Sequence, residues 1–182
     1  MENVSIVGID LAKRSFQLHG AAADGSVVFR KKLSRPQLTA FLSKLPRCVF
    51  AMEACAKSHH WGREIGKLGH EVRLIPPVYV KPFVKRQKND ANDAEAIAEA
   101  ASRPTMRYVS VKSAEQQAQG MVFRTRDLFV RQRSQLVNAL WGHLAEYDVV
   151  VAQGMVQFRR MITRFDEVAP DLPTETFGLC QA

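Results

Sequence analysis

The chain has 182 residues, which is long enough for one domain with a buried core and an appended arm but short for two full domains. Lys and Arg number 26 against 18 Asp and Glu, and the net charge of +8 favours a polyanionic partner, of which nucleic acid is the first candidate. Three cysteines without CxxC spacing indicate neither a disulfide framework nor a zinc site. No segment has the ~20 apolar residues of a membrane span and no signal peptide opens the chain, so we expect a cytoplasmic protein of the prokaryotic cell interior, without a membrane partner.

The first elements that the sequence predicts are three strands. Residues 4–9 are apolar and largely β-branched, as in a buried strand, and they lead directly to Asp10. Residues 15–22 and 26–32 are also strand-like and flank Asp24-Gly25, a hairpin turn signal. The chain therefore opens with a predicted antiparallel meander.

Helices and strands alternate after this meander. Residues 34–45 and 58–69 show apolar residues at helical spacing, and residues 48–52 and 71–75 form short apolar runs typical of strands. The first of these runs ends at Glu53, much as the opening strand ends at Asp10. The order predicts an α/β fold with a mixed sheet and flanking helices.

The later part of the chain is predicted to be helical. A cationic segment precedes an alanine-rich helix that begins near Asp90 and Asp93, two carboxylates whose spacing places them on one side of the first turn. A capping box at Ser113 opens a helix that continues to about residue 147, and Val122, Phe129 and Leu136 recur every seven residues as in paired helices. Residues 156–168 form a weaker helix, and residues 169–182 resemble a linker or tail.

Four acids in this order are suited to binding divalent cations. Mg²⁺ and Mn²⁺ take hard oxygen ligands, and two such ions can carry out phosphodiester chemistry when carboxylates from several elements hold them. The metal ligands and catalytic residues are predicted to be Asp10, Glu53, Asp90 and Asp93. Taken singly, Asp10 also fits a turn cap, Glu53 a surface acid, and the Asp90 and Asp93 pair a dipole-favoured helix start.

Basic side chains form two candidate nucleic-acid contacts, one near the acids and one on the long helix. The candidates are Lys13, Lys81, Lys85, Arg86, Lys88, Arg124, Arg126, Arg131 and Arg133. Solvated loop lysines and ordinary exposed helix arginines are the alternative interpretation. His59 and His60 follow Glu53 and fit structural, hydrogen-bonded histidines better than catalytic ones.

Three stretches resemble the IS110 family of insertion-sequence transposases, especially its IS1111 branch, which is also similar to the Piv invertase. They are VGIDLAK, then AMEAC with HHWGREIGKLGHEVRLIPPVYVKPFVKRQKNDANDAEAIAEA, and RPTMRYVSVKS, and the resemblance covers roughly residues 4–150. It implies a RuvC-like, RNase H-like domain with a DEDD tetrad, and the four acids occupy the matching positions. It also implies a coiled-coil region used in dimerisation and a structured guide RNA, the bridge or seeker RNA, that pairs with DNA.

The resemblance predicts the domain organisation and the activity. We expect a catalytic domain over residues 1–111, a helical dimerisation and RNA-contacting arm over 112–168, and a linker or tail over 169–182, without the family's C-terminal serine domain. The expected function is metal-dependent DNA strand chemistry in transposition. The expected partners are DNA, a guide RNA and a second copy of the chain, in a homodimer or a higher homo-oligomer. We expect the chain to be inactive alone, because the C-terminal domain is missing. Two alternatives are an autonomous nuclease or junction resolvase and a non-catalytic RNA-binding dimerisation module.

Overall fold

The computed structural model describes residues 3–85, 90–150, 152–168, 172–174 and 178. Its central feature is one five-stranded sheet in the order β3-β2-β1-β4-β5. The strands are β1 (Ile6–Leu11), β2 (Ser15–Ala21), β3 (Val27–Ser34), β4 (Val49–Glu53) and β5 (Glu71–Ile75). The opening meander and the two later strands are thus confirmed.

Strand direction follows from the pairing. β2 pairs with β1 and β3 in antiparallel fashion, whereas β4 is parallel to β1 and β5 is parallel to β4. β2 is therefore the one strand of this sheet that runs against the others. The mixed sheet confirms the predicted RNase H-like fold class, and its parallel centre places the carboxyl ends of β1 and β4 at the same edge.

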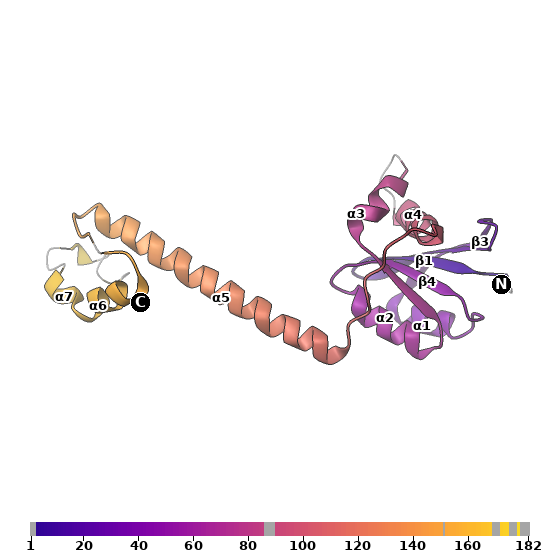
Figure 1. The fold of residues 1–182 in the computed structure, drawn as a ribbon, viewed down its shortest axis with the longest axis horizontal. Coiled ribbons are helices and arrows are strands. Elements are labelled where there is room, and N and C mark those ends of the chain that lie inside the picture. Colours follow the sequence, from indigo (N-terminus) through magenta and orange to yellow (C-terminus); the bar gives the residue numbers. More distant parts are fainter. Residues whose placement is uncertain (1–2, 86–89, 151, 169–171, 175–177, 179–182) are drawn as a thin grey trace. The chain divides into compact units, whose positions relative to one another are not determined.

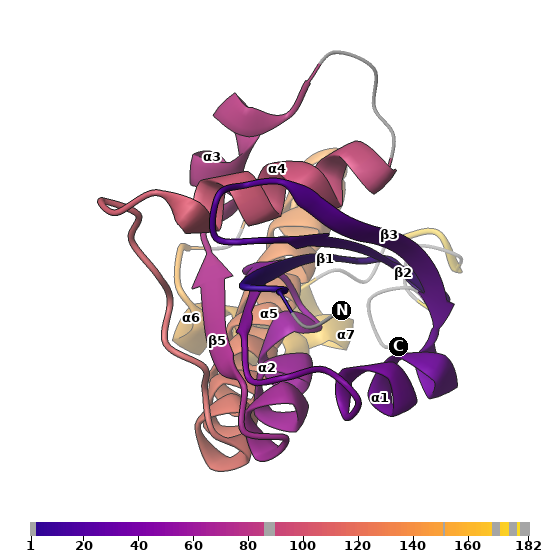
Figure 2. The ribbon, with the colours of Figure 1, turned by 90° about the vertical axis from the view of Figure 1, so that its right-hand side faces the viewer.

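Helices cover both faces of the sheet (Figure 2). The helices α1 (Arg35–Leu42) and α2 (Ser58–Lys67) lie on one face and α4 (Asp90–Ser102) lies on the other. Leu38 of α1 and Trp61 and Ile65 of α2 join one buried cluster with Val7, Ile9, Phe50 and Met52 of the sheet. Ala96, Ile97 and Ala100 of α4 join a second cluster with Ile6, Ala51 and Ile75.

Alternation of side chains along each strand explains the two clusters. Odd-numbered positions of β1 face α1 and α2, and even-numbered positions face α4, because successive residues of a strand point to opposite faces. Both faces of the central strands are apolar and covered, as expected for parallel neighbours in a sheet.

Two short elements connect β5 to α4. They are α3 (Pro77–Val80) and the 3₁₀ helix η1 (Lys81–Phe83). Pro76 directly follows β5 and precedes α3. Pro77 opens α3, since proline lacks the N–H that the first helical turn leaves without a partner.

The second part of the chain is helical. The chain forms two compact units, residues 1–117 and 118–182. The boundary between them lies within α5 (Ala114–Ala145), a continuous helix of 32 residues (Figure 1). Ser113 and Gln116 form the predicted capping box at its start. The shorter helices α6 (Met155–Thr163) and α7 (Phe165–Val168) follow, and Met161 and Phe165 pack with Leu140 and Leu144 of α5. Among the described residues, no helix combines the length and apolarity that crossing a bilayer requires.

Candidate metal site and nucleic-acid interface

Asp10 and Glu53 lie next to each other at the carboxyl ends of two neighbouring strands. Ile9 pairs with Met52 in the parallel β1 and β4 ladder, and the next residue of each strand is one of the two acids. Both carboxylate residues are half-buried. A single sheet edge therefore presents two acids that are 43 positions apart in the sequence.

Both acids lie on the face of the sheet that α4 covers. Asp10 shares this face with Ile6 and Gly8, and Glu53 shares it with Ala51, because residues two apart in a strand point to the same side. The side chains of Asp10 and Glu53 therefore leave the sheet toward the layer that contains α4.

The first turns of α4 lie over the carboxyl end of β1. A Cβ atom built on Gly8 would come within 2.1 Å of the carbonyl oxygen of Ala94, so helix and strand touch here. At the other end of α4, Ser102 lines a cavity of about 660 Å³ together with Ile6 at the start of β1. The helix thus runs opposite to β1, and its N-terminus points toward Asp10.

Asp93 is on the side of α4 that faces the sheet. It precedes the buried Ile97 by four residues and Ala100 by seven, a spacing that places all three on one stripe of the helix. Asp93 is half-buried. Asp90 begins α4 three residues earlier, and its side chain lies outside the described part of the structure.

The donor set fits a hard divalent cation in its chemistry. Carboxylate oxygens from β1, β4 and α4 are the ligands that Mg²⁺ and Mn²⁺ prefer. Among the described side chains, no three His, Cys, Asp or Glu residues come close enough to hold one ion. The structure places Asp10 and Glu53 side by side on neighbouring strands, and the N-terminus of α4 points toward them.

An ion-pair cluster on Glu95 lies beside these acids. Its carboxylate accepts hydrogen bonds from Arg30 of β3, at 2.7 Å, and from Lys85, which precedes α4. The hydrogen bond from Lys85 and the two positive charges hold the pKa of Glu95 below its ordinary value. The sequence does not predict this cluster, since 65 positions separate Arg30 from Glu95.

His19 is buried within the same cluster. Arg30 Nε donates toward His19 Nδ1 at 3.5 Å, and the Glu95 carboxylate lies 4.0 Å from the same nitrogen. Burial lowers the pKa of His19, and the attraction of Glu95 for a protonated ring does not offset it. His19 is therefore neutral near pH 7, and its Nδ1 accepts a hydrogen bond from the Arg30 guanidinium.

The predicted loop cations occupy different environments. Lys13 is exposed in the turn between β1 and β2, and Lys81 is exposed in η1. Lys85 is tied to Glu95. Arg86 and Lys88 lie outside the described residues.

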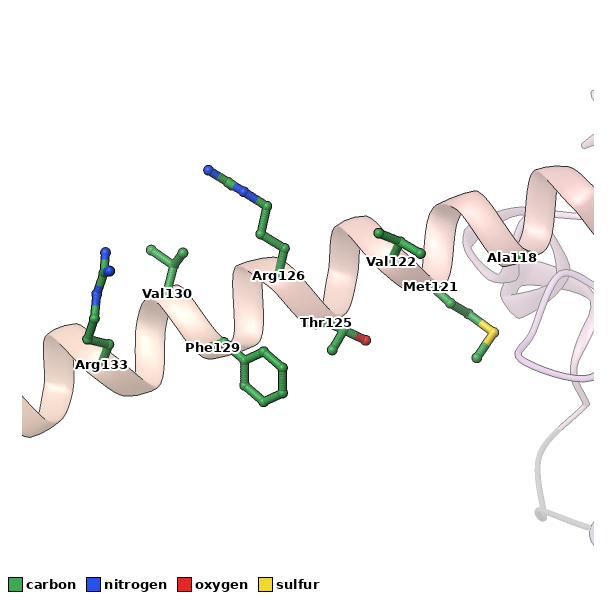
Figure 3. A pocket seen from close by; sticks show the side chains of 8 residues that line it. All are labelled: Ala118, Met121, Val122, Thr125, Arg126, Phe129, Val130 and Arg133. Atoms are coloured by element: carbon green, nitrogen blue, oxygen red, sulfur yellow. The ribbon is translucent and has the colours of Figure 1, made fainter. Parts of the chain in front are cut away.

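Four predicted arginines are exposed along α5. Arg124 and Arg131 donate back to the helix carbonyls of Gly120 and Asp127, and Arg126 lies 3.6 Å from the Asp127 carboxylate. Arg126 and Arg133 are among the residues that line an open, largely apolar pocket along the helix, and Figure 3 shows the side chains of these residues.

The two histidines after Glu53 differ. His59 Nδ1 accepts a hydrogen bond from the backbone N–H of Lys112 at 3.2 Å, and burial together with Lys112 and Arg63 lowers its pKa. His60 lies edge-on against Trp61, with 5.4 Å between the ring centroids. The hydrogen bond supports the structural interpretation of His59.

Comparisons with known proteins agree with the sequence pattern. Residues 7–148 match the family of IS110 DEDD transposases, whose description is "Transposase". The chain is 45% identical over 163 residues to the transposase for insertion sequence element IS1328 of Yersinia enterocolitica, covering 90% of this chain and 49% of that protein. It is 39% identical over 179 residues to the transposase for insertion sequence element IS1111A of Coxiella burnetii, covering 98% of this chain and 48% of that protein.

A search of solved structures found RuvC of T. thermophilus, in complex with a Holliday junction substrate, at a TM-score of 0.41 and 13% identity, covering 57% of this chain and 98% of that one. The chain spans about half the length of each of these two transposases. The match of the family to most of the chain fixes its membership. The chain belongs to the IS110 family of DEDD transposases.

Proposed function

We propose that this chain supplies the metal-binding portion of a transposase that acts on DNA in insertion-sequence transposition. The observation that carries the proposal is the placement of Asp10 and Glu53 on neighbouring strand ends, on the face toward which the N-terminus of α4 points. Asp93 and Asp90 complete the proposed ligand set from that helix.

Bound Mg²⁺ or Mn²⁺ would lower the pKa of a coordinated water and stabilise negative charge that develops on a phosphate. The chain's own residues hold and orient the ions. Asp10 and Glu53 come from neighbouring strands of one sheet, so their backbone positions are fixed relative to each other, and Asp93 is carried by the covering helix. Carboxylates that are brought to one ion site repel each other, and a bound cation would relieve this repulsion.

We further propose that the protein works as a homodimer with a guide RNA. The exposed apolar residues of α5, among them Val122, Phe129 and Leu136 at heptad spacing, support pairing with a second copy. The exposed arginines of α5 are suited to the RNA backbone. The guide RNA itself is proposed from the family.

Metal titration tests the site directly. We expect Asp10→Asn and Glu53→Gln each to weaken Mn²⁺ binding by about tenfold or more, because each removes a charged ligand. Isothermal titration calorimetry measures the affinity, and circular dichroism checks that each variant remains folded.

Glu71→Gln is the matched control. Glu71 is the same residue type, at the amino end of β5, where it pairs with Arg73 rather than with another acid. Its substitution should leave Mn²⁺ affinity unchanged. Wild-type affinity in both folded Asp10 and Glu53 variants would refute the proposed site.

A further inference from the structure

A row of polar residues crosses four strands of the sheet at the level of the two acids. Lys32 of β3 pairs with Gln17 of β2, and Gln17 pairs with Asp10 of β1. Glu53 follows on β4, one residue beyond the pair formed by Ile9 and Met52. The row runs from the carboxylates to β3, the strand at one edge of the sheet.

All four side chains leave the sheet on the α4 face. His19, two residues after Gln17, contacts the Glu95 cluster on α4, and Arg30, two residues before Lys32, bonds to Glu95 itself. Residues two apart in a strand share a face, so Gln17 and Lys32 point to the same side as Asp10 and Glu53.

The cations of two neighbouring rows, Arg30 and Lys32, differ in their partners. Arg30, in the neighbouring row, is ion-paired with Glu95, a carboxylate that it shares with Lys85. For Lys32 the described residues provide neither an ion pair nor a side-chain hydrogen bond, and its side chain is exposed. Gln17 is half-buried between Lys32 and Asp10. The row thus consists of two acids, an amide and a lysine that is not ion-paired with any described residue.

We propose that Gln17 and Lys32 bind the DNA backbone on the β3 side of the carboxylate site. This inference rests on the proposed function. Neighbouring strands are about 4.8 Å apart, so Lys32 begins about 10 Å from Asp10. Lys32 therefore contacts a different phosphate of the same DNA strand from the one at the acids. Gln17 donates a hydrogen bond from its amide to the backbone between them.

The adjacent lysine gives a matched control. Lys31 also lies on β3 and is also exposed, but it points to the opposite face, where its ammonium group is 5.0 Å from the centre of the Phe41 ring. Lys31→Gln and Lys32→Gln remove the same charge from neighbouring positions. They remove it from opposite faces of the sheet, and Lys31→Gln also removes the contact with Phe41.

Binding of a fluorescein-labelled DNA duplex to the full chain, measured by anisotropy over a KCl series with Ca²⁺ present, tests the inference. Lys32→Gln should reduce the slope of log Kd against log salt by about one and weaken binding several-fold at low salt. Gln17→Leu should weaken binding with the slope unchanged, since it removes a neutral contact. Lys31→Gln should resemble the wild type.

Measuring Mn²⁺ affinity distinguishes a failure of this inference from a failure of the proposed function. Lys32→Gln should retain wild-type Mn²⁺ affinity, because Lys32 is not a ligand. Equal salt slopes for the two lysine variants, with the Mn²⁺ site intact, would overturn this inference and leave the proposed function standing. A wild-type chain that fails to bind the duplex at low salt would count against both.

Discussion

Glu95 fixes the position of three groups from distant parts of the chain. Its two oxygens take Arg30 from β3 and Lys85 from the segment before α4, and His19 of β2 lies beneath them. The side chain of Glu95 is only 21% exposed, so these ion pairs are less screened than those on the open surface. Glu95 therefore helps to hold the start of α4 against the sheet.

The neutral state of His19 leads to a prediction about pH. Folding lowers the pKa of His19, so the unfolded chain binds the proton more readily, and stability should fall as the pH drops through about 6.5. His19→Gln keeps an acceptor for Arg30 but cannot titrate. Between pH 8 and pH 5 the melting temperature of the variant should therefore fall less than that of the wild type.

His143→Gln is the control for this measurement, because His143 is exposed on α5. Its pH profile should follow that of the wild type. A wild-type loss of stability that persists fully in the His19 variant would mean that other groups cause it.

At the scale of elements, the packing of α4 on β1 determines the geometry of the proposed metal site. Gly8 allows this contact, since any Cβ at that position would meet the Ala94 carbonyl at 2.1 Å and the Ala98 nitrogen at 2.7 Å. Both obstacles are backbone atoms, which cannot turn aside as the end of a side chain can. The position of the acids of α4 therefore depends on a glycine that has no side chain to contribute to the site.

Gly8→Ala should displace α4 and cost about 1–3 kcal/mol of stability. Because the helix carries Asp93, Mn²⁺ affinity should fall as well, although no ligand has changed. Chemical denaturation and metal titration of the same sample measure the two effects.

Gly66→Ala provides the comparison. Gly66 is exposed in α2, and a Cβ there would have nothing within 4 Å. Alanine should stabilise this helix by about 0.5–1 kcal/mol and leave Mn²⁺ affinity unchanged. If Gly8→Ala behaved in the same way, the close approach of α4 would not control the site.

The elements could be predicted because their signals are local. Apolar runs ending at Asp10 and Glu53, the Asp24-Gly25 turn and the capping box at Ser113 each depend on a few neighbouring residues. The polar row and the Glu95 cluster could not be predicted in this way. They depend on strand register and on how α4 lies across the sheet, and both are set by packing between distant segments.

At the scale of the whole molecule, the long helix presents more apolar surface than one copy covers. Met121, Val122, Phe129 and Leu136 are each at least 60% exposed on α5. Figure 3 shows the side chains that line the open pocket along α5, among them Phe129, Arg126 and Arg133. Arginines beside an apolar stripe can cover it with their aliphatic stems and keep their charge in water. The surface is thus suited to a partner helix with a polar rim.

Phe129→Glu tests the proposed homodimer. A carboxylate at the centre of the apolar stripe would be buried without a partner, which should weaken dimerisation by about 2 kcal/mol or more, or about thirtyfold. Analytical ultracentrifugation over a concentration series measures the dissociation constant. Ser134→Glu adds the same charge five residues further along α5, about 140° around the helix, and should leave the dimer intact. Equal dissociation constants for the two variants would place the contact between copies elsewhere, and a wild type that stays monomeric would leave the stripe to another partner.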